Sequence, residues 1–252
     1  MSTIGPNTPP TLPPTIDPIA AGDRVLEYGG GGVYDPATEA GVILDLWAEA
    51  GVTQAGTGVS SWVDRKGSKD FAQGTDANRP TYEAAGLGGK PSVLWVKANS
   101  DALVCASGPS STTKSYSLIA ALDPVTNNAS EWFLDAQTGR IIFAANSQGV
   151  TSLGWYDGAH DAIAASTLPP QIVRWKLTNG GNGEIFRGNT SLGTAAYTGV
   201  NFGGAVGLGS DYLGTGGFCD VRVGRAILCD TLDDTRDARI MAYLSAHYGI
   251  AL

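Results

Sequence analysis

Charged residues are scarce in this sequence, and the basic ones do not cluster. Asp, Glu, Lys and Arg make up 16% of the 252 residues, against about 25% in an average domain. No run of Lys or Arg occurs, and the net charge is −8. Phosphate backbones and anionic membrane surfaces are bound by clustered cations. We therefore expect neither direct nucleic-acid binding nor attachment to an anionic membrane surface.

Long apolar runs and a secretory leader are also missing. No stretch reaches the roughly 18 apolar residues that a membrane-spanning helix needs, so we expect no membrane insertion. The opening MSTIGPNTPPTLPPTIDPIA has no basic start and lacks the apolar run of about 7–15 residues found in signal peptides. We therefore expect synthesis in a cytoplasm without export by the usual secretory route.

Cysteine is sparse, with Cys105, Cys219 and Cys229 only. An odd and small number of cysteines is not a disulfide framework, and no Cys/His spacing suits zinc. We expect reduced thiols, with Cys219 in the core.

Glycine is abundant, with 35 residues, and it separates short segments rich in strand-forming residues. Such segments, divided by glycine-rich turns and not by helices, are typical of a β-sandwich or jelly roll. The sequence therefore predicts an all-β fold. The expected strands are 24–28, 59–63, 92–97, 115–122, 140–145, 150–156, 171–178, 204–208 and 217–225.

One helix is expected, at the C-terminal end. Thr231 can cap it with Asp234 three residues later, and Gly249 is placed to end it. Four apolar residues recur at helical spacing and should form its buried face. They are Ile240, Met241, Leu244 and Tyr248.

The N-terminal segment is rich in proline, which occupies six of the first twenty positions. Proline excludes a helix interior or a central strand and favours an extended backbone. We interpret residues 1–23 as an arm that anchors the chain to a partner; a disordered tail is the alternative. Residues 24–252 are expected to form a single domain.

Both ends of that domain resemble the concanavalin A-like, laminin-G-like jelly-roll family. The matching residues are Trp62, Asp64, Gly67, Arg79, Pro80, Tyr82, Gly89, Lys90, Pro91, Asp101, Leu103, Tyr243, Leu244, Tyr248 and Gly249. The sequence departs from the family at 95–98, Trp-Val-Lys-Ala, and at Asp220, where the family usually has Glu. The resemblance implies a jelly-roll sandwich with one short C-terminal helix. It also implies structural roles for Trp62, Trp95, Arg79 and Tyr82.

The stretch SSWVDRKGSKDF, residues 60–71, illustrates these roles. Trp62 should pack in the core, because alternate residues of a strand share a face. Asp64 should accept backbone N–H bonds in the following turn. Arg65, Lys66 and Lys69 are expected to be solvated turn residues.

The resemblance also implies a candidate calcium site, because laminin-G-like domains often hold calcium at a rim. Asp64, Asp101 and Asp211 are the candidates by chain position. Loop aspartates without a metal are the alternative, and no other cofactor is expected.

A candidate carbohydrate-binding site lies at WYDGAHDAI, residues 155–163. Trp155 and Tyr156 could form an exposed aromatic platform. Asp157, His160 and Asp161 could then hydrogen-bond to sugar hydroxyls, or hold a metal. The alternatives are core packing for Trp155 and a hairpin turn at Asp157-Gly158.

Catalysis is not expected. Members of this superfamily that cleave glucans place acidic residues at positions i and i+2 of one strand, which puts both carboxylates on one face. None of the 24 acidic residues here forms such a pair. The sequence therefore predicts a protein that is not an enzyme.

A bacteriophage virion protein would combine an anchoring arm, a lectin-like domain and the lack of an export signal. The leading expectation is a head decoration or fibre-type protein, assembled in the host cytoplasm and oligomeric in the particle. Its partners would be other virion proteins, bound through the arm. The alternatives are a tail or baseplate protein that binds host-surface glycan, and a glycan-cleaving enzyme.

Overall fold

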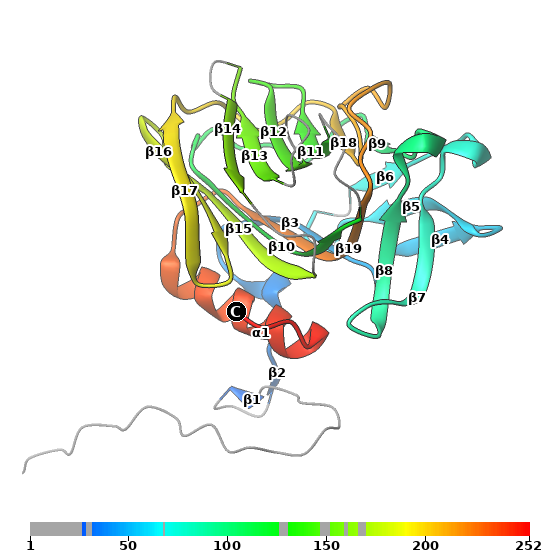
Figure 1. The fold of residues 1–252 in the computed structure, drawn as a ribbon, viewed down its shortest axis with the longest axis horizontal. Helices are drawn as coiled ribbons and strands as arrows, with labels where there is room; N and C mark the ends of the chain where they lie inside the picture. The colour runs from blue at the N-terminus through cyan, green and yellow to red at the C-terminus, as the bar shows by residue number, and fades with distance from the viewer. Residues whose placement is uncertain are drawn as a thin grey trace, which may run out of the picture.

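The computed structural model describes residues 27–28, 32–67, 69–125, 131–146, 152–158, 161–165 and 170–252. The arm predicted over residues 1–23 lies outside these ranges. Within them the chain is almost entirely antiparallel β-structure with one α-helix, which confirms the predicted fold class. Figure 1 shows two facing layers of strands, with the helix packed beneath one of them.

The first layer is the sheet against which the helix packs. In spatial order its strands are β17 (Thr190–Tyr197), β16 (Gly181–Arg187), β15 (Gln171–Leu177), β10 (Tyr116–Pro124), β19 (Val221–Cys229) and β3 (Val42–Trp47). The N-terminal end of β19 also pairs with β8 (Lys90–Trp95), which pairs with β7 (Thr81–Leu87).

The second layer faces the first across the core. Its strands are β14 (Asp161–Ala165), β13 (Ser152–Tyr156), β12 (Ile141–Asn146), β11 (Glu131–Ala136), β18 (Val206–Leu208), β9 (Leu103–Cys105), β6 (Asp70–Ala72), β5 (Gly58–Val63) and β4 (Val52–Ala55). A pairing of β5 with β7 joins the layers into one hydrogen-bonded sheet of 17 strands. The remaining short elements are β1 (Glu27–Tyr28), β2 (Gly32–Val33) and the 3-10 turns Pro36–Thr38, Asp76–Asn78 and Lys97–Asn99.

The core between the layers is built around tryptophan. Trp62 and Trp95 have no exposed surface, and their ring centroids lie 5.8 Å apart in a stacked arrangement. Trp175 is equally buried. Strand alternation explains this placement, since each ring lies on the face of its strand that meets the opposite layer.

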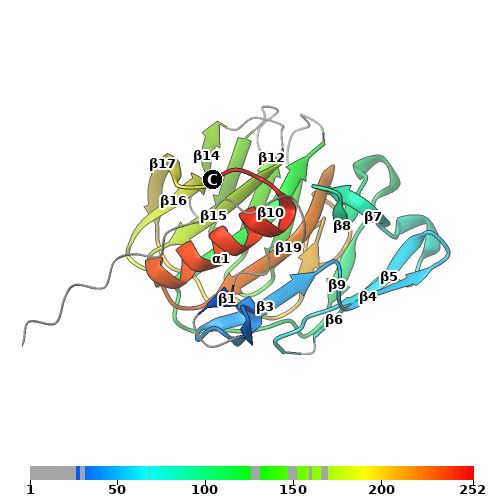
Figure 2. The same ribbon diagram turned by 90° about the horizontal axis from the view of Figure 1, so that it is seen from below.

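A second apolar cluster lies between the first sheet and α1 (Asp234–Tyr248), which crosses β10, β15 and β19 in Figure 2. The helix buries the four apolar residues expected from its periodicity, and Gly249 ends it in a left-handed conformation. Tyr248 lies so close to Gly224 of β19 that a Cβ atom at Gly224 would overlap its ring. No helix in the described part of the chain could span a membrane.

The helix cap differs from the expectation. Asp233, not Thr231, caps α1, and its carboxylate accepts from the backbone N–H groups of Thr235 and Arg236. Thr231 instead accepts two bonds from the Arg236 guanidinium, through its hydroxyl and its carbonyl oxygen. Thr231 therefore binds a buried cation, and the helix begins two residues later than predicted.

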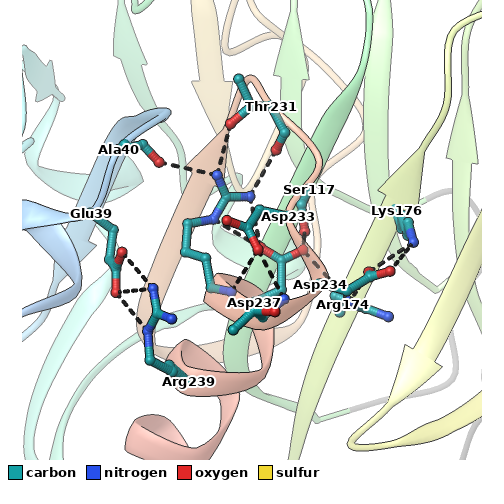
Figure 3. A network of polar contacts seen from close by, with 12 residues as sticks. Glu39, Ala40, Ser117, Arg174, Lys176, Thr231, Asp233, Asp234, Asp237 and Arg239 are labelled. Carbon is teal, nitrogen blue, oxygen red and sulfur yellow. Dashed lines mark hydrogen bonds and ion pairs between the residues drawn. The ribbon is translucent and has the colours of Figure 1, made fainter. Parts of the chain in front are cut away.

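Polar contacts tie the helix to the sheet (Figure 3). Arg236 also binds Asp237, whose carboxylate accepts from Ser117 of β10 at 2.6 Å. Asp234 accepts from Arg174 and Lys176 of β15 at 3.0 and 2.7 Å. A buried charge is tolerated when it is paired and hydrogen-bonded, so this network fixes the position of the helix.

The turn after β5 forms as expected around Asp64. Its carboxylate accepts from the backbone N–H groups of Asp45, Lys66 and Gly67, at 2.7, 2.9 and 2.6 Å. Burial raises the pKa of Asp64, and these three hydrogen bonds oppose that rise. Asp64 therefore acts as a structural acceptor between β3 and the turn.

Arg65 is not the solvated turn residue that was expected. Its guanidinium pairs with Asp35 at 2.8 Å and Asp45 at 3.0 Å, and it lies 4.9 Å from the centroid of the Trp47 ring. Arg225, fully buried, binds Asp45 from the other side. The two arginines neutralise a buried carboxylate, which the local sequence did not reveal. Lys66 is exposed, and Lys69 is half-buried.

The three cysteines are free and buried, with Cys219 in the core between the layers.

Candidate functional site

The predicted carbohydrate platform lies on a hairpin of the second layer. Strands β13 and β14 pair antiparallel with Tyr156 opposite Asp161, and Asp157 and Gly158 begin the connection between them. Gly158 has a φ of +86°, a conformation that glycine adopts without strain.

Trp155 is buried, which corrects the expectation that it forms part of an exposed platform. Its side chain is 2% exposed and belongs to the core between the layers. It lies directly against Gly183 of β16, where a Cβ atom would overlap the ring. Because successive residues of a strand point to opposite faces, Tyr156 points outward instead, and it is 36% exposed.

The polar residues of that platform are also placed differently. Asp157 is only 3% exposed, and its carboxylate accepts from the backbone N–H and the hydroxyl of Thr198, at 3.0 and 2.9 Å. It ties the hairpin to the end of β17 and is not presented to a ligand. His160 lies outside the described residues, and the side chain of Asp161 is not described.

The three calcium candidates bind separate parts of the backbone. Asp64 holds the turn after β5, Asp101 accepts from the backbone N–H of Val96 at 2.8 Å, and Asp211 accepts from Thr215. Burial, reinforced by the charge of Asp220, raises the pKa of Asp101 to about 6. Among the described residues no three His, Cys, Asp or Glu side chains are grouped to hold a metal.

Arg79 and Tyr82 are the other residues expected to be structural. Arg79 lies just before β7, and Tyr82 lies near its start. Arg79 donates to the carbonyl oxygens of Gln73 and Gly74 and pairs with Asp76, so it holds the loop before β7. Tyr82 packs against the core between the layers.

A groove of about 390 Å³ lies where loops from both layers meet, and it is the candidate functional site. Four chain segments form it: the loop before β10, the turn after β11, the loop before β18, and the residue after β19. The lining residues are Ser110, Ser111, Thr112, Thr113, Thr138, Asn201, Phe202, Gly203, Gly204 and Asp230.

Hydrogen bonds between these segments hold the groove open in one shape. Ser111 and Phe202 exchange backbone bonds of 2.8 and 3.2 Å. The buried hydroxyl of Tyr116 accepts from the Phe202 N–H at 2.8 Å. The Thr113 hydroxyl donates to the carbonyl oxygen of Asp230 at 2.7 Å, and Thr138 donates its N–H to Gly203 at 2.9 Å. The walls are therefore built before any ligand arrives.

The groove leaves polar groups unused. The carboxylate of Asp230, half-buried at the groove, makes no hydrogen bond or ion pair with the described residues. The amide oxygen of Asn201 is buried and has no hydrogen-bond partner among the described residues. The exposed hydroxyls of Ser110, Thr112 and Thr138 are likewise not bonded to described residues. Acceptors and hydroxyls of this kind suit a ligand that is itself rich in hydroxyl groups.

Sequence reasoning missed the groove. Its lining residues are single hydroxyl and amide residues in four loops that are up to 120 positions apart, from 110 to 230. None of these loops carries a motif, and only the pairing of the strands brings them together.

Comparison with known proteins supports the fold but does not show a family. No protein-family model and no curated protein matches the chain. Among solved structures, an arabinofuranosidase complexed with arabinofuranosyl-α-1,2-xylobiose has a TM-score of 0.60 at 12% identity, over 86% of this chain and 61% of that chain. Domain 4 of AbnA, a GH43 extracellular arabinanase from Geobacillus stearothermophilus in complex with arabinotriose, has a TM-score of 0.53 at 12% identity.

The AbnA match covers 79% of this chain and 98% of that domain. A GH54 α-L-arabinofuranosidase soaked with a cyclic sulfate inhibitor matches with a TM-score of 0.59 at 11% identity, over 86% of this chain. The present chain thus spans about 61% of the length of the arabinofuranosidases that it matches.

These matches contradict the prediction that the chain is not an enzyme. The similar structures are arabinofuranosidases and a domain of an arabinanase, which are enzymes. The absence of paired acidic residues on one strand is therefore no ground for excluding catalysis, because carboxylates from different strands or loops can also meet. At this level of identity the matches establish the β-sandwich fold, which is consistent with the concanavalin A-like architecture expected from the sequence.

Proposed function

We propose that this chain is a glycan-binding β-sandwich domain and that the end groove holds the sugar. The observation that carries the proposal is the Asp230 carboxylate, left unpaired among the described residues at a groove walled by hydroxyl groups. Small-molecule sites are concave and commonly range from about 300 to 1,000 Å³. The volume of about 390 Å³ suits one or two sugar rings.

The chemistry of the groove matches a neutral sugar. The Asp230 carboxylate can accept from two vicinal hydroxyls, and charge-assisted bonds of this kind are the stronger ones. The hydroxyls of Ser110, Thr112 and Thr138 can donate or accept as the sugar requires. Affinity per domain is expected to be weak and to gain from several copies acting together.

The similar structures supply the first ligands to test. Two of them were solved with arabinotriose or with arabinofuranosyl-α-1,2-xylobiose. We propose arabinose-containing oligosaccharides as the ligand class of the groove.

Whether the chain also cleaves the bound sugar depends on the carboxyl groups at the groove. Glycoside hydrolysis commonly uses two carboxyl groups that flank the bond. Asp230 is the one carboxylate among the described lining residues. A second carboxylate would have to come from elsewhere, so release of reducing sugar should be measured alongside binding.

Calorimetric titration with arabinotriose and with arabinofuranosyl-xylobiose tests the proposal. We expect Asp230→Asn to weaken binding at least about tenfold, and Thr138→Trp to abolish it by filling the groove. Asp70→Asn, an exposed aspartate on β6, is the matched control and should bind like the wild type. Equal binding by the wild type and both groove variants would contradict the proposal. Reducing-sugar release that Asp230→Asn abolishes would extend it to catalysis.

We propose separately that residues 1–23 anchor this domain to a larger assembly, with a bacteriophage particle as the specific case. The support is the proline content of that segment, which favours an extended arm. Deletion of residues 1–23 should remove the protein from the particle and leave its melting temperature nearly unchanged. Hundreds of copies per particle would indicate a decoration protein, and a handful would indicate a tail protein. Normal incorporation of the truncated chain would contradict the anchoring role.

A further inference from the structure

The outer face of the second layer carries a row of residues that do not point into the core. Register places Gly207, Asp135, Ile142 and Tyr156 side by side on β18, β11, β12 and β13. Their neighbours Leu134, Phe143 and Trp155 belong to the core between the layers. Alternation therefore directs this row away from the core. Gly207, Asp135 and Ile142 are nevertheless buried, so Tyr156 is the exposed member of the row.

Arg140 is held over this row by three groups. Its Nε lies 3.2 Å from Oδ2 of Asp135. Its guanidinium carbon lies 5.1 Å from the Trp132 ring centroid and 5.2 Å from that of Tyr212. Stacking of a guanidinium on aromatic faces fixes its plane. The side chain is nevertheless 38% exposed, and its two Nη groups bond to no described residue.

The groups that hold Arg140 are themselves fixed. Trp132 packs against Gly217, where a Cβ atom would overlap its ring, and Tyr212 donates its N–H to Oδ2 of Asp135 at 3.1 Å. The turn before Arg140 is equally constrained, because a Cβ at Gly139 would lie 2.7 Å from the Cβ of Val200. Arg140 itself has a φ of +51°, a conformation that non-glycine residues adopt at a cost.

A purely structural ion pair does not account for this arrangement. An arginine that only neutralises a carboxylate gains most from two parallel N–H bonds through its fork. Here only Nε faces Asp135, and the two Nη groups have no described partner. A planar cation with a fixed orientation, and with donors that no described residue occupies, is the arrangement that recognises a ligand carboxylate.

We propose that this face is a second binding site, separate from the end groove, in which Arg140 binds the carboxylate of an acidic sugar. Tyr156, outward-facing and two strands from Asp135, lies about 10 Å away by strand spacing. It offers an exposed ring for the next sugar unit. The choice of a sugar as the carrier of the carboxylate rests on the proposed function; the anion site rests on Arg140.

Two acidic residues modulate the site. Asp135 is fully buried, its Oδ1 has no hydrogen-bond partner within the described part of the chain, and burial raises its pKa to about 6. Asp211, in the loop that carries Tyr212, adds to that rise. An ionised Asp135 partly cancels the charge of Arg140. Removal of the Asp135 charge should therefore strengthen anion binding, whereas removal of the Arg140 charge should abolish it.

Titration with trigalacturonic acid, a glucuronate trisaccharide and sialyllactose, each beside its carboxyl-reduced form, tests the site. We expect at least one acidic form to bind about tenfold more tightly than its reduced form, since a charge-assisted pair contributes that order of free energy. Arg140→Gln should remove this preference, and Asp135→Asn should increase it. Lys69→Gln, the same charge change in the loop before β6, is the control and should keep the preference.

The melting temperature of each variant shows whether it is folded, and arabinotriose binding shows whether the end groove is intact. Loss of the acid preference in a folded Arg140→Gln protein that still binds arabinotriose supports the site. The site is overturned if no acidic form is preferred by the wild type, or if Arg140→Gln keeps the preference. Loss of arabinotriose binding in Asp230→Asn with the acid preference retained separates the two sites.

Discussion

At the scale of single residues, one step along a strand decides whether an aromatic ring can meet a ligand. Trp155 and Tyr156 are neighbours, yet the first packs in the core and the second reaches solvent. The same alternation puts Leu134 in the core and Asp135 on the outer face. Residue type alone did not indicate the face, because both faces of this sheet carry aromatic residues.

Replacing a core tryptophan by alanine should destabilise the fold strongly, whereas replacing the exposed tyrosine should have little effect on stability. Trp62→Ala is expected to lower the free energy of unfolding by about 3–5 kcal/mol, through lost burial and a residual cavity. Tyr156→Ala, at a partly exposed position, should cost less than about 1 kcal/mol. Urea denaturation of both variants checks this, and similar costs for the two would contradict the assigned faces.

Asp64 should contribute more to the free energy of unfolding than an ordinary turn residue does. Its carboxylate accepts three backbone bonds, one from Asp45 on another strand. Asp64→Ala leaves these donors unpaired, and we expect a loss of about 2–3 kcal/mol. Asp76→Ala, at an exposed carboxylate paired with Arg79, should lose less than about 1 kcal/mol. An Asp64→Ala protein as stable as Asp76→Ala would show that these bonds contribute little.

At the scale of elements, the C-terminal helix is placed by charged groups as much as by its apolar face. Its cap Asp233 is exposed, whereas Arg236 and Asp237 are buried and bonded to the loop before the helix and to β10. Asp233 therefore stabilises the helix itself, whereas Arg236 and Asp237 stabilise the packing of the helix on the loop and the sheet.

We therefore expect substitutions in the first turn of α1 to lower the free energy of unfolding by different amounts. Asp233→Ala should lower the free energy of unfolding by about 1 kcal/mol, the usual cost of a lost N-cap. Thr235→Ala, at an exposed position of the same turn, is the control and should cost less than about 0.5 kcal/mol. Thermal denaturation followed by circular dichroism separates the two. A larger loss for Thr235→Ala would show that the cap is assigned wrongly.

At the scale of the whole molecule, three carboxyl groups form two classes with opposite pKa shifts. Burial raises the pKa of Asp101 and Asp135 to about 6. Burial also acts to raise the pKa of Asp35, but hydrogen bonds from Arg65 and Ala37 overcome it and hold that pKa at about 2. The fold thus contains carboxyl groups that prefer to be neutral beside others that are held ionised.

These classes predict a stability maximum in mild acid. Between about pH 6 and 4 the folded state binds protons at Asp101 and Asp135 that the unfolded state does not, so stability rises as the pH falls. Below about pH 4 the contribution of Asp35 is lost as its carboxylate is protonated. Urea midpoints measured from pH 7 to 3 check this. Asp135→Asn should flatten the slope between pH 6 and 4, and an unchanged slope would contradict the role of that group.

The sequence by itself determined the classes of structure in this protein. Alternation, glycine-rich turns and the spacing of apolar residues predicted the β-fold and the C-terminal helix, because these patterns reflect local backbone geometry. The turns at Asp64 and at Asp157-Gly158 were predicted for the same reason. Several strands, among them β3, β16 and β17, were not predicted, since glycine or aspartate interrupts their patterns.

Only the tertiary structure brought together the residues of the two proposed binding sites. The groove at Asp230 needs four separate loops, and the site at Arg140 needs Trp132 and Asp135 of β11 beside Tyr212 from a distant loop. Likewise, Arg225 meets Asp45, 180 positions away, to neutralise it. Local sequence cannot show such contacts, because the free energy of each polar group depends on which distant group is brought beside it and on how much water the surrounding chain excludes.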